Sequence, residues 1–352
     1  MKPLISIIIP CHNAANYVDR CLKSLVSQTL GIDKLQLILV DDASTDDTLS
    51  ALQKYEQIYP ESIILISYDK NLGPGGARNI GLEYADADYI GYCDIDDWVE
   101  SQMYERLYEK TYVSIQGSEI PNTRYDIVYC KYTRDSSYSH VASRHDASYS
   151  FHSHNGLYWG KDELTDTGIN GRFIRSCWAG IYKKDLLLNN SIFFPEGLIH
   201  EDIYWMELVS LHASNAYIVD LPLYHYEINP DSITSVNNDI RLLDRLKIET
   251  MLVEAYKERN ALEYFKPDIV SEFINRFYIN TIYKLFTKFE ICPNVYETMH
   301  TVIYTYFPDW ENYLHIYSQD PSVQYLLNLL KARDKLTDAE LTEVRRRFME
   351  LQ

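Results

Sequence analysis

Apolar runs and helical repeats alternate along the first 135 residues of the chain. The run at 4–9 is apolar except for Ser6, which is typical of a strand buried on both faces. The segment after it repeats apolar residues at helical spacing, as at Val18, Cys21 and Leu25. Strands are predicted at 4–9, 35–40, 63–67, 89–93 and 126–132, and helices at about 18–26, 45–59 and 75–85. This alternation predicts an α/β fold, a largely parallel sheet with helices on both faces.

The rest of the chain has a weaker pattern that becomes helical. Residues 134–170 are rich in Ser, His, Tyr and Asp without clear periodicity, which predicts a long loop or insertion. Regular signals return at 177–182, at a helix near 202–211 and at a short strand around 216–219. From about residue 239 the pattern is helical, and 331–352 is predicted to be one amphipathic helix. We therefore expect a domain boundary near residue 238.

Composition excludes several classes of protein. The 352 residues carry 33 Lys and Arg against 51 Asp and Glu, a formal charge of −18, which argues against nucleic acid as a partner. No apolar run is long enough to span a bilayer, and the six-residue run near the start is too short for a signal peptide. The six cysteines form no CxxC pair, so we expect buried, reduced thiols and a cytoplasmic protein.

Polar clusters follow three of the predicted strands. They are Pro10–Asn13, Asp41–Ser44 and Asp94–Asp97. Each alone is explained by a helix cap or a turn, but ligands bind at the carboxyl ends of strands in open parallel sheets, and three converging clusters predict a binding site. The spacing of Asp94 and Asp96 allows two carboxylates to share one hard cation, Mg²⁺ or Mn²⁺, whose remaining ligands come from water and a diphosphate.

A glycine-rich segment, Gly73–Gly76, precedes the third predicted helix. It lacks the Gly-Lys-Ser/Thr of a phosphate-binding P-loop, and it does not follow the first strand as a dinucleotide-binding fingerprint does. Arg78 comes at the start of the helix, where an arginine and a helix N-terminus together can hold phosphate or sugar hydroxyls. The alternative is an ordinary turn followed by a surface arginine.

These motifs together resemble a family 2 glycosyltransferase with the GT-A fold. The resemblance rests on IIPCHNAANYVDRCLKSLVSQTL, LVDDASTDDT and NLGPGGARNIGLEYADADYIGYCDIDD, and further along on FPEG…EDI and LYHY…SIT. It covers about residues 1–235 and leaves the helical region outside. It implies a GT-A domain at 1–238, with a donor half at about 1–133 and an acceptor half at about 134–238, and a separate helical domain at 239–352.

The resemblance implies inverting transfer of a sugar from a nucleotide diphosphate, with a UDP-sugar as the expected donor. Transferred by position, the residues expected to bind the donor are Pro10, His12, Asn13, Asp42, Arg78 and Asp94. Asp96 is the expected ligand of Mn²⁺ or Mg²⁺, and His225 is a weaker metal candidate. Asp202 is the expected general base, with Glu201 beside it.

The expected acceptor is a hydroxyl of a glycan, polymer or lipid-linked molecule in the synthesis of a surface polysaccharide or glycoconjugate. Peripheral contact with the inner face of a membrane and self-association through the C-terminal helices remain open. Two departures from the family pattern, His12 in place of a frequent Tyr and Glu227 in place of a frequent Arg, keep a second reading open. That alternative is a catalytically silent GT-A module that binds nucleotide or partners. A nucleotidyltransferase, the third candidate, would normally have a glycine-rich, basic first loop.

Overall fold

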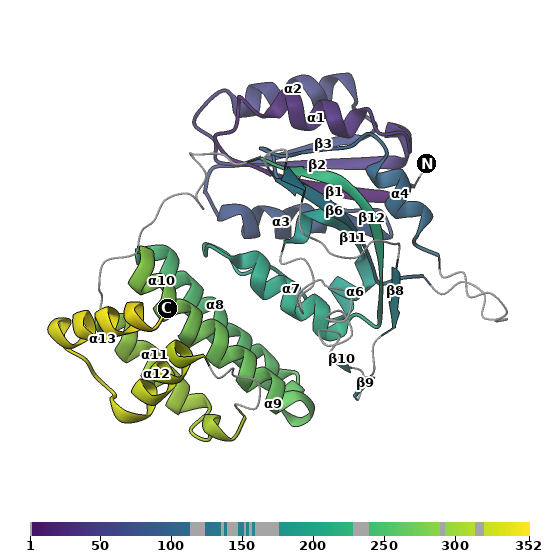
Figure 1. Cartoon of the computed structure of the whole chain (residues 1–352). Helices are drawn as coiled ribbons and strands as arrows, with labels where there is room; N and C mark the ends of the chain where they lie inside the picture. Colours follow the sequence, from purple (N-terminus) through teal and green to yellow (C-terminus); the bar gives the residue numbers. More distant parts are fainter. Residues whose placement is uncertain are drawn as a thin grey trace. The chain divides into compact units, whose positions relative to one another are not determined.

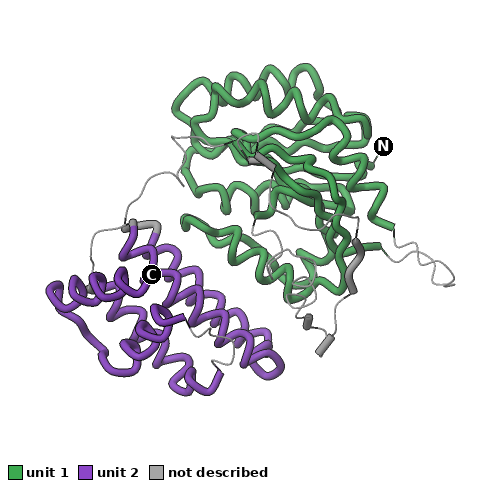
Figure 2. Tube along the Cα trace, in the orientation of Figure 1, with its two compact units in different colours: residues 1–232 green, residues 233–352 purple. Residues whose placement is uncertain are grey.

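The structure of the protein is a computed structural model. It describes residues 2–112, 124–134, 137–138, 147–150, 153–154, 157–158, 176–227, 239–288, 293–313 and 320–352. The chain divides into two compact units, Met1–Ser232 and Ile233–Gln352 (Figure 2). The division falls six residues before the expected boundary at 238, which itself lies outside the described residues.

The core of unit 1 is a parallel sheet built from the apolar runs of the sequence. Its first strands are β1 (Ile5–Cys11), β2 (Leu35–Asp42), β3 (Ile63–Tyr68) and β4 (Tyr89–Tyr92). They lie in the order β3-β2-β1-β4, and all three pairings are parallel. All residues of β1 and β2 are buried, as the continuous apolar runs predict for strands covered on both faces.

The sheet continues beyond β4 with strands of mixed direction. They are β11 (Gly180–Lys183), β6 (Ile127–Arg134), β12 (Asn215–Tyr226) and the short β5 (Trp98–Val99). The predicted strand at 216–219 is much longer in the structure, because β12 continues through register shifts around Pro222. Proline cannot donate to the ladder and interrupts the alternation, so the pattern hides the second half of this strand. That second half leads back to the end of β4.

The segment predicted as a loop, 134–170, contains short strands where it is described. They are β7 (Ser137–Tyr138), β8 (Ala147–Ser150), β9 (Ser153–His154) and β10 (Leu157–Tyr158). β7 pairs with β6 and β8 pairs with β12, whereas β9 and β10 pair with each other. Elements of two to four residues are too short to show a period in the sequence.

Helices cover both faces of the sheet in unit 1. α1 (Val18–Val26) and α2 (Thr48–Ile58) lie over one face, and α3 (Gly73–Glu83) lies over the other (Figure 1). The remaining helical elements are η1 (Ile32–Lys34), α4 (Met103–Glu109), η2 (Cys177–Ala179), α6 (Lys184–Asn189) and α7 (Glu201–His212). Gly81 lets α3 approach the sheet closely, since a Cβ there would lie 2.4 Å from Cγ2 of Ile8. The five described cysteines are free and buried, and Cys292 lies outside the described residues.

Unit 2 is helical, as predicted. Its elements are α8 (Asp239–Glu258), α9 (Ala261–Phe273), the π-helix η3 (Ile274–Ile279), α10 (Asn280–Lys288), α11 (Pro293–Tyr306), η4 (Trp310–Tyr313), α12 (Pro321–Ala332) and α13 (Asp338–Leu351). Large aromatic side chains fill its core, among them Phe277, Tyr278, Tyr296 and Trp310. Searched over the described residues, the chain has no helix with the length and hydropathy needed to cross a membrane.

The prediction of one helix over 331–352 is wrong at its start. α12 ends at Ala332, and α13 begins at Asp338. A capping box starts the second helix: the Thr337 side chain accepts from the backbone N–H of Glu340, and the Glu340 carboxylate accepts from the backbone N–H of Thr337. The Thr-x-x-Glu signature of this capping box is visible in the sequence.

Candidate functional site

The loops that follow β1 and β2 meet, as the sequence predicts. Nδ1 of His12 lies 2.6 Å from the backbone oxygen of Asp42. The side-chain oxygen of Asn13 accepts from the backbone N–H of Thr45 at 2.8 Å, and the backbone N–H of Asn13 donates to Oγ of Ser44 at 3.0 Å. Asn13 has φ of 47°, a left-handed conformation that asparagine tolerates better than most residues. The Pro10–Asn13 turn is therefore fixed against the end of β2.

Asp42 also ties this corner to the loop before α3. The Asp42 side chain is buried, and its Oδ1 accepts from the backbone N–H of Leu72 at 2.8 Å. Nδ2 of the neighbouring Asn71 lies 3.2 Å from each ring nitrogen of His12. Sequence reasoning missed Asn71, for which the only signal is its place just before the glycine-rich segment. The predicted nucleoside residues thus form one corner built from three loops.

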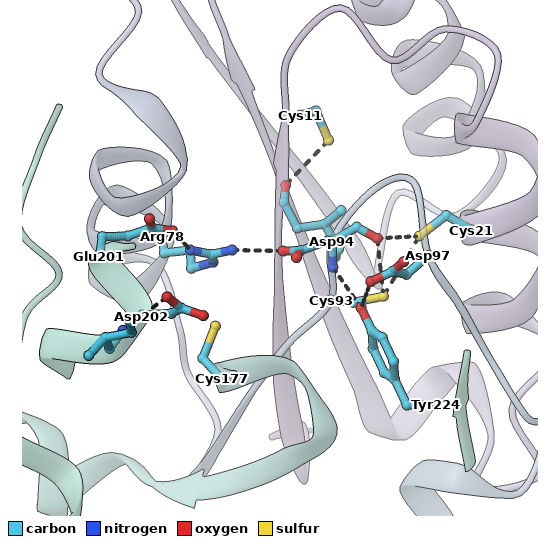
Figure 3. A network of polar contacts seen from close by, with 12 residues as sticks. Cys11, Cys21, Arg78, Cys93, Asp94, Asp97, Cys177, Glu201, Asp202 and Tyr224 are labelled. Carbon is cyan, nitrogen blue, oxygen red and sulfur yellow. Dashed lines mark hydrogen bonds and ion pairs between the residues drawn. The ribbon is translucent and has the colours of Figure 1, made fainter. Parts of the chain in front are cut away.

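Arg78 joins two carboxylates that are far apart in the sequence (Figure 3). Its Nη2 donates to Oδ1 of Asp94 at 2.7 Å, and its Nη1 donates to Oε1 of Glu201 at 2.5 Å. The Arg78 side chain is only 4% exposed, and its guanidinium lies over the Phe194 ring, 5.2 Å from the centroid. Both terminal nitrogens are thus engaged by protein carboxylates. In this structure Arg78 links the end of β4 to the start of α7, whereas the sequence suggested direct contact with the donor.

Close packing between α3 and the segment before α7 makes that link possible. A Cβ on Gly75 would lie 2.6 Å from the backbone oxygen of Pro195 and 3.1 Å from Cγ of Glu201. The side chain of Asn79 donates to the backbone oxygen of Phe194 at 2.8 Å and accepts from its N–H at 2.9 Å. The GPGGARN motif therefore docks the segment that leads into α7.

Asp202 lies in the first turn of α7 beside this ion network. Burial, and after it the charge of the adjacent Glu201, raise the pKa of Asp202 to about 7, while Arg78 opposes the shift. Figure 3 places the Asp202 carboxyl next to Arg78 and to the thiol of Cys177. Glu201 is itself buried and paired to Arg78. Of the two predicted catalytic residues, Asp202 therefore has the pKa of a base that works near neutral pH, and Glu201 has a positioning contact.

The Asp94–Asp97 loop is held by the end of β12. The Tyr224 hydroxyl donates to Oδ2 of Asp97 at 2.5 Å and accepts from the backbone N–H of Asp94 at 3.2 Å. Oδ1 of Asp97 accepts from the backbone N–H of Glu227 at 2.8 Å. Burial, together with the charges of Asp94 and Asp96, raises the pKa of Asp97 well above its usual range. Sequence reasoning missed the roles of Asp97 and Tyr224, which position the loop.

The two predicted metal residues differ in their surroundings. Nδ1 of His225 lies 2.7 Å from Oγ1 of Thr133, its Nε2 lies 2.8 Å from Oε1 of Glu100, and its ring stacks on Trp98. Both ring nitrogens of His225 have protein partners, so the structure gives the weaker metal prediction no support. Asp96 is partly exposed, and within the described part of the chain no three or more His, Cys, Asp or Glu side chains gather as a metal site. A hard cation there fits Asp96 only with oxygens of a bound diphosphate completing its ligands.

Comparisons with known proteins show the family and the fold of the chain. Residues 6–184, just over half of the chain, match Glycosyl transferase family 2. The glycosyltransferase YibD of Escherichia coli K12, itself uncharacterized, is 28% identical over 233 residues, which are 66% of this chain and 64% of YibD, under two thirds of its length. Poly(ribitol-phosphate) beta-glucosyltransferase of Bacillus spizizenii is 36% identical over 104 residues, 30% of this chain and 16% of that protein.

A solved structure shares the fold over nearly the whole chain. It is S. aureus TarS 1-349 in complex with UDP-GlcNAc, with a TM-score of 0.74 and 20% identity, covering 99% of this chain and 92% of that one. The sheet and the match to this structure show the GT-A fold. The chain belongs to Glycosyl transferase family 2, and the predicted family and fold are confirmed.

Proposed function

We propose that the chain transfers a sugar from a UDP-sugar to a hydroxyl of a glycan, polymer or lipid-linked acceptor, with inversion at the anomeric carbon. The family match, the TarS complex with UDP-GlcNAc and the poly(ribitol-phosphate) beta-glucosyltransferase relative support this class of donor and an acceptor in surface polysaccharide or glycoconjugate synthesis. The observation that carries the proposal is Asp202, a carboxyl with a pKa of about 7 held beside the network that reaches the end of β4.

The chemistry is a single displacement. The acceptor oxygen forms a bond to the anomeric carbon as the bond from that carbon to the diphosphate oxygen breaks, and the electron pair leaves with UDP. Asp202 takes the proton of the acceptor hydroxyl, a step for which a pKa near the working pH is most effective. Arg78 keeps Glu201 at the start of α7 and Asp94 at the end of β4 at fixed positions relative to this base.

Donor recognition would use the corner formed by the first loops. His12 and Asn13 would face the nucleoside, and the buried Asp42 is the acceptor expected for a ring N–H of uracil. Asn71 lies against His12 and extends this set. Because these side chains are fixed by hydrogen bonds to backbone atoms of neighbouring loops, the corner is organised before the nucleotide arrives.

We further propose that the chain binds Mn²⁺ or Mg²⁺ as a cofactor. Asp96 would hold it together with the diphosphate of the donor, and such a cation neutralises charge that develops on the leaving nucleotide. The carboxylates of the Asp94–Asp97 loop have the oxygen chemistry that this cation prefers. The protein contributes the fixed loop, which Tyr224 and Asp97 hold in place.

The test is binding followed by turnover. Thermal stability is measured with UDP, GDP, CDP and dTDP, each with Mn²⁺ and with EDTA, since a ligand at 100-fold over its Kd stabilises by roughly 2.7 kcal/mol. We expect a shift with UDP that depends on metal, and UDP release from a UDP-sugar when poly(ribitol phosphate) or another glycan is added. Binding of UDP without release from any UDP-sugar would favour the catalytically silent module, and no shift with any nucleotide would contradict the proposal.

A further inference from the structure

Arg20 reaches the Asp94–Asp97 loop from the first turns of α1. Its Nη2 donates to the backbone oxygen of Asp96 at 2.6 Å, and its Nη1 pairs with Oε2 of Glu227 at 3.0 Å. The guanidinium therefore joins three segments: the helix after β1, the loop after β4 and the end of β12. Neither the helical pattern of α1 nor the family resemblance had singled out Arg20.

The charge around this loop is strongly negative. Asp94, Asp96 and Asp97 come from the loop itself, and Glu227 lies beside it. A nucleoside diphosphate placed here adds further negative charge, which one divalent cation does not fully offset. Within the contacts described above, Arg78 has both terminal nitrogens engaged and is 4% exposed, whereas the Arg20 side chain is 41% exposed.

The contacts of Arg20 allow its guanidinium to exchange the Glu227 carboxylate for a diphosphate. The Glu227 side chain is 42% exposed, and an ion pair this open contributes little to stability. A diphosphate offers more oxygens and more charge than one carboxylate, and arginine binds phosphate with two parallel hydrogen bonds. The bond from Nη2 to the Asp96 carbonyl holds the guanidinium next to the predicted metal ligand while Nη1 changes partner.

We propose that Arg20 binds the diphosphate of the donor, and that Glu227 occupies the Arg20 guanidinium when the donor is absent. This inference rests on the proposed function and names a further residue of the same site. The proposal also accounts for Glu227, at a position where the family often carries Arg. Arg20 on α1 supplies the positive charge, and the Glu227 carboxylate is its counter-ion.

Calorimetric titration with UDP and with uridine, each with Mn²⁺, tests the inference. Because a hydrogen bond to a charged group is worth about 1.5–3 kcal/mol, Arg20→Gln is expected to weaken UDP binding at least tenfold and to leave uridine binding unchanged. Glu227→Gln removes the competing carboxylate and is expected to tighten UDP binding about threefold. Arg20→Lys, which keeps the charge but not the paired hydrogen bonds, should lie between wild type and Arg20→Gln.

Arg106→Gln is the matched control, since Arg106 pairs with Glu109 on α4 at comparable exposure and should leave UDP binding unchanged. Equal UDP affinity for wild type and Arg20→Gln would overturn the inference and leave the proposed function standing. Equal weakening of UDP and uridine would overturn it too, because Arg20 would then act only by holding the Asp96 loop. Absence of UDP binding by the wild type would refute the proposed function and this inference together.

Discussion

Among the described residues, each of the two units contains a network of carboxylates around buried arginines. In unit 1, Arg78 pairs with Asp94 and Glu201, which lie 16 and 123 residues away from it in the sequence. In unit 2, Glu249 pairs with Arg245 four residues before it and with Arg276 in the π-helix. The arginines of both networks are almost fully buried, yet only the first network lies at the strand ends, beside a carboxyl whose pKa is raised to about 7.

Both networks contain buried charges, but they differ in what surrounds them. A buried ion pair is weak evidence for either stability or activity, since its desolvation cost is close to its Coulombic gain. What distinguishes the unit 1 network is the convergence of polar loops from β1, β2 and β4 near it and the presence of Asp202. The unit 2 network connects helices of one bundle, and we assign it a structural role.

The largest effect is expected for Asp202→Asn. Asparagine keeps the shape of the side chain but cannot accept the acceptor's proton, so UDP release in the presence of acceptor should fall about 10³-fold. UDP affinity, measured by calorimetry, should stay near wild type because Asp202 is not part of the nucleoside corner. Near-normal turnover by this variant would show that another group is the base.

Arg78→Met and Arg276→Met compare the two networks directly. Arg78→Met leaves Asp94 and Glu201 without their cation, which costs about 3–5 kcal/mol, and Arg276→Met leaves Glu249 with Arg245 alone. Both should therefore unfold at a clearly lower temperature by calorimetry. Only Arg78→Met should lose activity per folded molecule at low temperature, by about 10²-fold, because the start of α7 would no longer be held to the end of β4. Equal activity losses in both variants would contradict a functional role for the unit 1 network alone.

A smaller effect is expected on the pH dependence of the stability of unit 1. The pKa of Asp202 is about 7 in the folded protein and about 4 in an unfolded chain, so the folded state holds this proton more tightly. The resulting stabilisation is complete below about pH 4 and is lost as pH rises through about 7. Asp202→Asn should therefore unfold at a higher temperature than wild type at about pH 8, by a few degrees, with a smaller difference at about pH 5. A difference that does not change with pH would contradict the raised pKa.

The smallest effect is expected for Thr337→Ala in unit 2. Loss of the capping box should cost about 1 kcal/mol, seen as a small decrease in the denaturant midpoint. UDP affinity and turnover should be unchanged, since α13 belongs to unit 2 and carries none of the site residues. A loss of UDP affinity in this variant would show that unit 2 contributes to the site.

The sequence was enough to predict the strands of the parallel sheet and the strand-end clusters, because long apolar runs and the residues after them are local features. The contacts of Arg78 with Glu201, of Tyr224 with Asp97 and of Arg20 with Asp96 and Glu227 join residues 76 to 207 positions apart, and no local pattern encodes such pairs. The same holds for the pKa of Asp202, which depends on burial by segments that meet only in the folded chain. The position of His225 in a motif suggested a metal ligand. It gave no sign of the Thr133 and Glu100 side chains, which contact its two ring nitrogens in the folded chain.

In the proposed function, Asp202, held beside the Arg78 network, is the base of a sugar transfer from a UDP-sugar. The most direct test is the pH dependence of kcat/KM for UDP release from the preferred UDP-sugar at roughly pH 5.5 to 9. We expect a rate that rises with a single ionisation near 7 in the wild type, and a low, flat profile in Asp202→Asn. A wild-type profile without an ionisation in that range, or one that Asp202→Asn reproduces, would contradict this role of Asp202.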